Sequence, residues 1–246
     1  MDCEKMKKIR VTAVLLAVLL FGGIKVFANT EGVGGTEVVA DKGRTIVFYG
    51  DSNTYGFDPA DMTEGRFPEE QRWTTLLQTA VGNQWTIVSE GLNGRKIPDL
   101  PQAAGWLSPV IEEAGEDGIF AVMLGTNDIL SYIEPDVEEV RDRMDAFLSF
   151  LTGKMDPDRI LVITPVPSGR KDDENLQIRK YYEACISMNS EFEDLADVYG
   201  VHFADTADWG VELCYDLVHI SEEGQKTFAV EMEKVLRELD MTRPEA

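Results

Sequence analysis

The chain has 246 residues, of which 45 are acidic and 23 are basic, and its formal net charge is −22. A surface this negative repels nucleic acid and anionic lipid, so neither is an expected partner. The length is enough for one domain with a substantial core, and the sequence shows neither an internal repeat nor a second domain boundary.

The first 28 residues have the pattern of a secretory signal peptide. Four basic residues lie within the first ten positions, an apolar run follows at Val11–Ile24, and residues 26–28 are small or branched, as a signal peptidase requires. The apolar run is shorter than the roughly 20 residues of a spanning helix, so a permanent anchor is the alternative. We therefore expect a secreted or cell-surface protein with no stable membrane insertion after cleavage.

The rest of the chain divides into three parts. Residues 29–43 are polar and glycine-rich and are predicted to form a linker. Residues 44–240 form the predicted domain, and residues 241–246 form a C-terminal tail. Cys185 and Cys214 remain after signal cleavage, and the sequence leaves open whether they pair or stay free.

Five apolar runs are candidates for strands, and they are continuous rather than alternating. This pattern is typical of strands buried on both faces of a sheet. The runs are Thr45–Tyr49, Trp85–Ser89, Ile119–Leu124, Arg159–Thr164 and, more weakly, Tyr199–Phe203.

Segments with helical periodicity separate or follow these runs. Apolar residues recur at steps of three and four in Asp136–Leu151, from Tyr181 to Leu195, and from Phe228 to Leu239. Asp136 and Ser221 are placed to cap the first and last of these helices. Alternating strands and helices predict an α/β fold, a three-layer α/β/α sandwich with a mostly parallel sheet of about five strands.

The first three predicted strands each run into a polar turn that contains glycine. These turns are Gly50–Asn53, Gly91–Gly94 and Gly125–Asp128. Because ligands bind outside the carboxyl ends of the strands in parallel sheets, all three turns are expected at one functional edge.

Ser52, in the first turn, is a candidate nucleophile, and a serine hydroxyl needs an adjacent base to react. The chain has only two histidines. His202 lies inside an apolar run and is interpreted as structural. His219 follows Asp216 by three residues, so the carboxylate can orient the imidazole while Nε2 faces the serine.

An oxyanion formed during acyl transfer needs hydrogen-bond donors. The candidates are the backbone N–H of Ser52, the backbone N–H of Gly94 and the side-chain amide of Asn127. Gly91 is the other glycine of the second turn that could serve as a donor.

These segments resemble the four sequence blocks of the SGNH hydrolases, also called GDSL esterases. The blocks are Gly50–Ser52, a glycine of the second turn, Gly125–Asp128 and Asp216–His219, in that order. The stretches YGDSNTYG, GRFPEEQRW and EGLNGR resemble the arylesterase and acyltransferase branch of this family.

The resemblance implies a flavodoxin-like SGNH hydrolase fold and assigns a role to each site residue. Ser52 would be the nucleophile, His219 the base and Asp216 its orienting acid. The amides of Ser52 and Gly94 and the side chain of Asn127 would form the oxyanion hole. Asn53 departs from the family pattern, because a leucine often stands at this position.

The expected function is that of a serine esterase acting on short-acyl, notably acetyl, esters of carbohydrates or other small alcohols through an acyl-enzyme. Acyl transfer to alcohols and a lysophospholipase-like lipase activity are alternatives within the family, and a non-catalytic surface binding module is an alternative outside it. The sequence contains neither H-E-x-x-H nor clustered Cys and His, so no metal or cofactor is expected.

Overall fold

The computed structural model describes residues 43–63, 65–100 and 102–241. The predicted signal peptide, residues 29–42 of the predicted linker and residues 242–246 of the tail lie outside these ranges. Among the helices within them, none combines the length and the apolar character that a membrane crossing requires.

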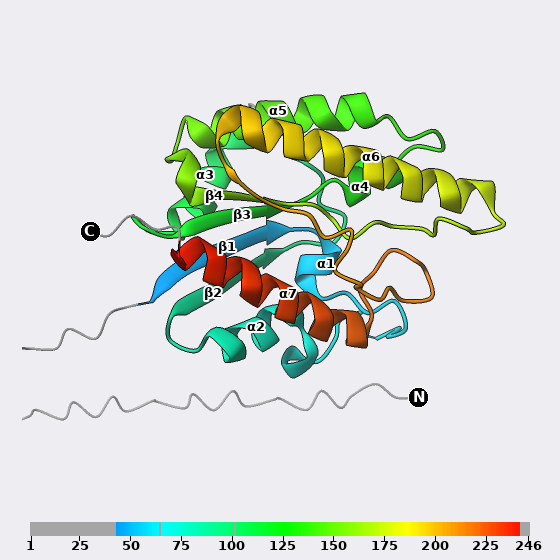
Figure 1. The fold of residues 1–246 in the computed structure, drawn as a ribbon, viewed down its shortest axis with the longest axis horizontal. Coiled ribbons are helices and arrows are strands. Elements are labelled where there is room, and N and C mark those ends of the chain that lie inside the picture. Colours follow the sequence, from blue (N-terminus) through cyan, green and yellow to red (C-terminus); the bar gives the residue numbers. More distant parts are fainter. Residues whose placement is uncertain (1–42, 64, 101, 242–246) are drawn as a thin grey trace, which may run out of the picture. The chain divides into compact units, whose positions relative to one another are not determined.

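Five strands form one parallel sheet in the order β2-β1-β3-β4-β5 (Figure 1). The strands are β1 (Arg44–Gly50), β2 (Trp85–Gly91), β3 (Ile119–Met123), β4 (Ile160–Ile163) and β5 (His202–Ala204). This is the flavodoxin-like order, in which the chain turns to one side of β1 for β2 and to the other side for β3. The predicted fold class is confirmed.

In the described part of the chain, seven helices and two short 3₁₀ turns connect or follow the strands. The helices are α1 (Ser52–Tyr55), α2 (Trp73–Val81), α3 (Ala104–Glu112), α4 (Thr126–Leu130), α5 (Val137–Thr152), α6 (Leu176–Tyr199) and α7 (Glu222–Met241), and the 3₁₀ turns are η1 (Glu69–Gln71) and η2 (Pro157–Arg159). The predicted caps are present, because Asp136 accepts from the N–H of Glu139 and Ser221 accepts from the N–H of Gly224.

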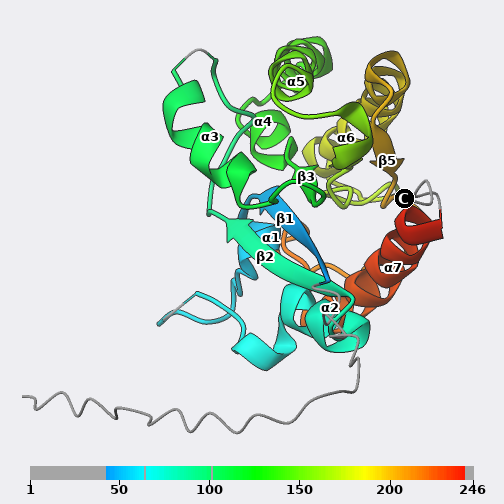
Figure 2. The same cartoon turned by 90° about the vertical axis from the view of Figure 1, so that its left-hand side faces the viewer.

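The helices lie on both faces of the sheet (Figure 2). One face packs Val47, Tyr49, Phe120 and Val122 against α3, α4, α5 and α6. The other face packs alternate residues of the same strands, such as Phe48, against α2 and α7. Because both faces are covered, each strand alternates between two apolar layers, which explains the continuous apolar runs in the sequence.

The last strand begins later in the chain than the predicted run Tyr199–Phe203. Tyr199 is the final residue of α6, and Gly200 ends the helix in the left-handed conformation with φ 65°. The strand then begins at His202. Glycine adopts this conformation without a steric penalty, so it fixes the boundary between helix and strand.

The carboxyl ends of β1, β2 and β3 lie level with one another. Gly50 is paired with Gly91 on one side and with Met123 on the other. The three predicted turns therefore follow the strands at the same edge of the sheet. This edge also contains the point between β1 and β3 where the strand order reverses, which is the usual ligand position in such folds.

Candidate active site

Ser52 is the first residue of α1, and only the N-cap residue Asp51 separates it from the end of β1. Its N–H therefore has no acceptor within the helix. The short helix lies close to the end of β2, where a Cβ atom on Gly91 would be only 2.2 Å from the backbone nitrogen of Tyr55. A glycine at position 91 is thus required for α1 to pack against the sheet.

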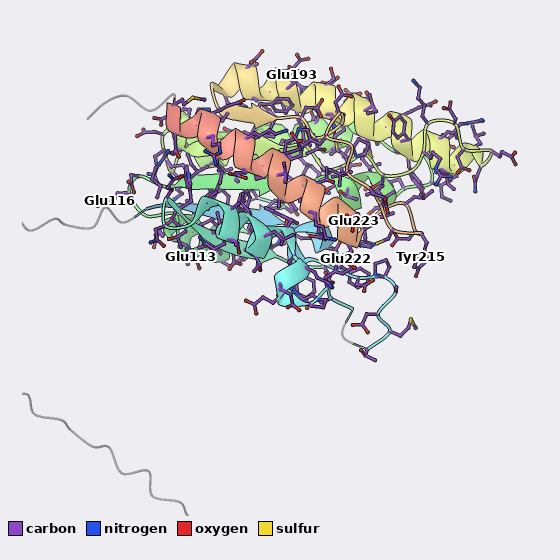
Figure 3. All side chains as sticks on the ribbon, turned by 60° about the horizontal axis from the view of Figure 1, so that its bottom comes forward. Glu113, Glu116, Glu193, Tyr215, Glu222 and Glu223 are labelled. Carbon is purple, nitrogen blue, oxygen red and sulfur yellow. The ribbon has the colours of Figure 1, made fainter. Side chains whose placement is uncertain are left out.

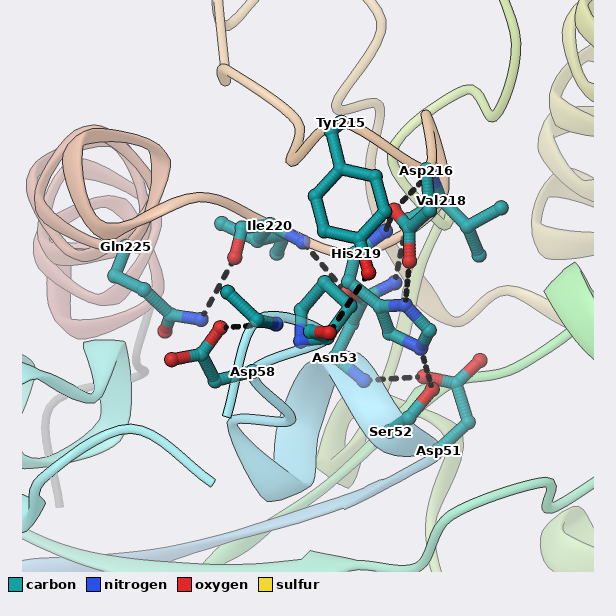
Figure 4. Close-up of polar contacts among 12 residues, drawn as sticks. Asp51, Ser52, Asn53, Asp58, Tyr215, Asp216, Val218, His219, Ile220 and Gln225 are labelled. Atoms are coloured by element: carbon teal, nitrogen blue, oxygen red, sulfur yellow. Dashed lines mark hydrogen bonds and ion pairs between the residues drawn. The ribbon is translucent and has the colours of Figure 1, made fainter. Parts of the chain in front are cut away.

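His219 connects Ser52 to Asp216 (Figure 4). Its Nε2 is 3.0 Å from Ser52 Oγ, and its Nδ1 is 2.6 Å from Asp216 Oδ2. The other carboxylate oxygen of Asp216 accepts from the backbone N–H groups of Val218, at 3.0 Å, and His219, at 3.1 Å. The carboxylate therefore orients both the imidazole and the backbone that carries it.

Asp216 is held in its ionised form. Burial alone would raise its pKa, but the hydrogen bonds from the His219 side chain and from the backbone of His219 and Val218 outweigh this effect. The net result is a lowered pKa for the Asp216 carboxyl. A negative charge at this position would stabilise an imidazolium at His219.

The turn between Asp216 and His219 contains a strained residue. In the described part of the chain, Leu217 is the single non-glycine residue with a positive φ, at 59°. Its carbonyl accepts from the N–H of Gly169, at 2.8 Å, in the segment after β4. Such conformations persist only where surrounding contacts hold them, and they concentrate at functional sites.

The segment after α1 packs directly against the imidazole. The ring centroids of Phe57 and His219 are 4.6 Å apart. Tyr215, which is 77% exposed, donates from its hydroxyl to the carbonyl of Pro59 at 2.8 Å. Figure 3 shows Tyr215 projecting next to this segment. One face of His219 is therefore covered by an apolar side chain.

The two remaining candidate oxyanion donors follow β2 and β3. Gly94 has φ 74° and open space around its Cα, so glycine is favoured there by backbone conformation. The amide nitrogen of Asn127 donates to the carbonyl of Arg95 at 3.0 Å and lies 3.4 Å from the Asp51 carboxylate. The second contact is the longer and weaker of the two hydrogen bonds, so its N–H is the one that a bound oxyanion could take over.

A model of the GDSL-like lipase/acylhydrolase family matches residues 48–227. The chain belongs to this family. The match spans all four blocks, so the resemblance to the SGNH or GDSL hydrolases is confirmed, and the protein is a carboxylic ester hydrolase.

Individual relatives of this GDSL-like hydrolase include both sequences and solved structures. A GDSL esterase/lipase of Arabidopsis thaliana is 24% identical over 219 residues, which cover 79% of this chain and 86% of that protein. A carbohydrate acetylesterase family member from Sinorhizobium meliloti is 26% identical with a TM-score of 0.62, covering 80% of this chain and 98% of that one. An aryl esterase of M. smegmatis is 22% identical with a TM-score of 0.64, covering 80% and 99%.

Polar side chains that no sequence motif assigned to the site hold the segment after the second turn of this GDSL-like hydrolase. Asp128 accepts from the N–H of Ile97 at 3.1 Å, and Arg143 of α5 contacts both the Asp128 carboxylate, at 3.3 Å, and the carbonyl of Ile97, at 2.7 Å. Arg95 stacks over the Tyr49 ring at 4.1 Å. These contacts join residues far apart in the sequence. The one sequence signal for them is that Asp128 belongs to the polar turn Gly125–Asp128.

Neither a metal-binding cluster nor a disulfide is found among the described residues. Within the described ranges, no three His, Cys, Asp or Glu side chains come together in a way that could hold a metal ion. Cys185 is buried and Cys214 is partly exposed, and both are free thiols.

Replacing Asn127 with alanine is expected to lower kcat of the GDSL-like hydrolase on p-nitrophenyl acetate. Loss of one oxyanion donor typically reduces kcat about 10²- to 10³-fold. KM should change less than about threefold, because the donor acts mainly on the transition state. If kcat/KM fell by this factor only because KM rose, with kcat unchanged, Asn127 would bind the substrate rather than the oxyanion.

Asp51 is expected to make the stability of the GDSL-like hydrolase pH-dependent. The carboxyl is 1% exposed, and burial raises its pKa to about 6, although it accepts from the N–H of Asn53. In the unfolded chain the pKa returns to 3.8. The folded protein therefore retains a proton that the unfolded chain has released, and stability falls as pH rises through this window.

The isosteric change Asp51→Asn removes this titration. The stability of the variant relative to the wild type should rise by about 1.4 kcal/mol between pH 5 and pH 8, because pH 5 lies one unit below the folded pKa. Urea unfolding of both proteins at the two pH values measures the difference. The contributions of the other carboxyl groups cancel, because both proteins contain them. A relative stability that is equal at pH 5 and pH 8 would contradict the prediction.

Proposed function

We propose that this protein is a serine esterase that removes short acyl groups, notably acetyl, from carbohydrates or other small alcohols. The observation that supports it is the continuous chain of contacts from Ser52 Oγ through the His219 imidazole to the Asp216 carboxylate. The preference for acetylated carbohydrate is supported by the similarity to a carbohydrate acetylesterase family member. The signal-like N-terminal sequence supports action outside the cytoplasm.

In the proposed reaction, Ser52 Oγ attacks the ester carbonyl while His219 Nε2 accepts its proton. Asp216 stabilises the resulting imidazolium. The N–H groups of Ser52, Gly94 and the Asn127 amide donate to the developing oxyanion. His219 then returns the proton to the leaving alcohol, and an acyl group remains on Ser52.

Water completes the cycle. His219 removes a proton from a water molecule, whose oxygen attacks the acyl carbonyl and forms a second oxyanion at the same donors. Collapse of this intermediate breaks the bond to Ser52 Oγ and returns the proton to it. An alcohol in place of water would give acyl transfer.

A substrate panel tests the proposal. We expect kcat/KM on p-nitrophenyl esters to fall at least about tenfold from acetate to octanoate, because each added methylene needs a complementary apolar site. Acetate should be released from acetylated xylan, and added alcohol should not divert most of the product to a new ester. Higher kcat/KM on octanoate than on acetate would contradict the short-acyl assignment.

A covalent label tests the nucleophile separately from the substrate. An organic fluorophosphonate should add one phosphonyl group to the peptide that contains Ser52, because an activated serine displaces fluoride. Mass spectrometry of the digested protein locates the group. Labelling on another serine, with Ser52 unmodified, would contradict the proposed mechanism.

A further inference from the structure

Asn53 is the residue next to the proposed nucleophile, and its side chain lies beneath the segment that carries His219 (Figure 4). It is 3% exposed. Its amide nitrogen donates to the carbonyl of Val218 at 3.2 Å, and its amide oxygen accepts from the N–H of Ile220 at 2.9 Å. One side chain therefore binds both backbone neighbours of His219.

These two hydrogen bonds belong to a closed ring of buried polar contacts. The carbonyl of Asn53 accepts from the indole N–H of Trp73 at 3.0 Å, and the N–H of Trp73 donates to Gln225 Oε1 at 2.9 Å. Gln225 Nε2 donates to the carbonyl of Ile220 at 3.5 Å, which returns the ring to Asn53. Trp73, Ile220 and Gln225 are all 0% exposed.

The ring connects elements that are far apart in the sequence. Asn53 lies on α1, Trp73 begins α2, Gln225 lies in the first turn of α7, and Ile220 directly follows His219. A buried amide without a hydrogen-bond partner lowers the stability of the folded protein. Each member of the ring is therefore held in the one orientation that keeps its partners bound. The backbone on both sides of the imidazole is thereby tied to the helix that carries Ser52.

We propose that Asn53 is a positioning residue, which sets the distance between His219 Nε2 and Ser52 Oγ by binding the backbone on both sides of the histidine. The inference rests on the proposed function of Ser52 and His219 and adds a residue to it. Neither of its hydrogen bonds touches the reacting atoms, so Asn53 acts through His219. The role gives a physical reason for a buried polar side chain at this position.

The change Asn53→Ala should lower kcat on p-nitrophenyl acetate about 10- to 100-fold, because small displacements of a catalytic group have effects of this size. KM should stay within about twofold. Asn189→Ala is the matched control, since Asn189 is also buried, at 4% exposed, and its amide donates to Asp205 at 2.9 Å. The control should lose stability while its kcat stays within about twofold.

The isosteric change Asn53→Asp gives a second readout in a side chain of the same shape. It keeps the acceptor for the N–H of Ile220 but replaces the donor to Val218 with a carboxylate oxygen. A protonated carboxyl can still donate to the Val218 carbonyl, whereas an ionised one repels it, so kcat relative to the wild type should fall as pH rises. A kcat equal to that of the wild type at every pH would overturn the inference.

A double-mutant cycle decides whether Asn53 acts through His219. Phosphonylation of Ser52 by a fluorophosphonate, followed by mass spectrometry, measures even slow variants. If Asn53 only positions His219, Asn53→Ala should slow the wild type but leave the His219→Ala variant unchanged. An equal fold-loss in both backgrounds would overturn the inference. Failure of the proposed function would show differently, as labelling that does not depend on Ser52.

Discussion

Replacing Ser52 with alanine is expected to lower kcat on p-nitrophenyl acetate by about 10⁴- to 10⁶-fold, the range found when a serine nucleophile is removed. The Ser52 hydroxyl joins α1 to Nε2 of His219, at 3.0 Å. In the proposed mechanism no acyl-enzyme can form without Oγ, which leaves the proposed oxyanion donors and His219 to assist attack by water. The loss should appear in kcat, measured with purified protein at saturating ester.

Ser108→Ala is a suitable control for this experiment. Ser108 lies on α3 and donates only to the carbonyl of Ala104, one helical turn earlier. Its loss should change kcat less than about twofold, since bonds of this kind contribute little to the fold. If Ser52→Ala retained more than a tenth of the wild-type activity, the nucleophile would be a different group and the proposed mechanism would be wrong.

The fold could be predicted from the sequence because a parallel sheet covered on both faces has strands with a recognisable sequence pattern. Val47 and Phe48 are adjacent and both buried, but they contact opposite helical layers. Such strands read as continuous apolar runs that end in polar turns. The predicted turns then fall at one edge because parallel strands share a direction. This is why Ser52 and Asn127, 75 positions apart, could be placed together without a structure.

The helices α2 and α3 were less accessible to this reasoning. Each has only nine residues, and α3 contains Pro109. Short segments give too few repeats to establish a helical period, and an internal proline argues against a helix. Trp73 nevertheless starts α2 fully buried, held by Gln225 of α7. Tertiary contacts, rather than local pattern, decide these elements.

Side-chain to backbone hydrogen bonds explain most of what the sequence did not reveal about the site. The contacts of Asn53 reach residues 165 and 167 positions away. Arg143 reaches Ile97 across 46 positions. Their acceptors are mainly backbone carbonyls, which are chemically the same at every residue, so no sequence spacing marks them. Triads differ in this respect, because serine, histidine and carboxylate are few and chemically distinct.

The second large effect is expected at the two histidines, which the structure places in different environments. His219 contacts Ser52 and Asp216 at the functional edge of the sheet. His202 begins β5, and its Nε2 lies 3.0 Å from the carbonyl of Asp158 in η2. His202 therefore lies at the amino end of its strand, whereas the three polar turns and Ser52 follow the carboxyl ends of theirs. We expect no contact between His202 and the substrate.

We therefore expect His219→Ala to lower kcat on p-nitrophenyl acetate by about 10⁴- to 10⁶-fold, because the serine loses its base and the leaving alcohol loses its acid. His202→Ala should lower stability slightly and change kcat less than about twofold. Measuring both variants in one series makes each the control of the other, since each removes an imidazole from the same fold. Added imidazole should restore part of the activity of His219→Ala, because a free base can enter the space that the ring vacates. The reverse result, with activity lost in His202→Ala and kept in His219→Ala, would identify His202 as the base. It would also contradict the role of Asp216 as the partner of the base.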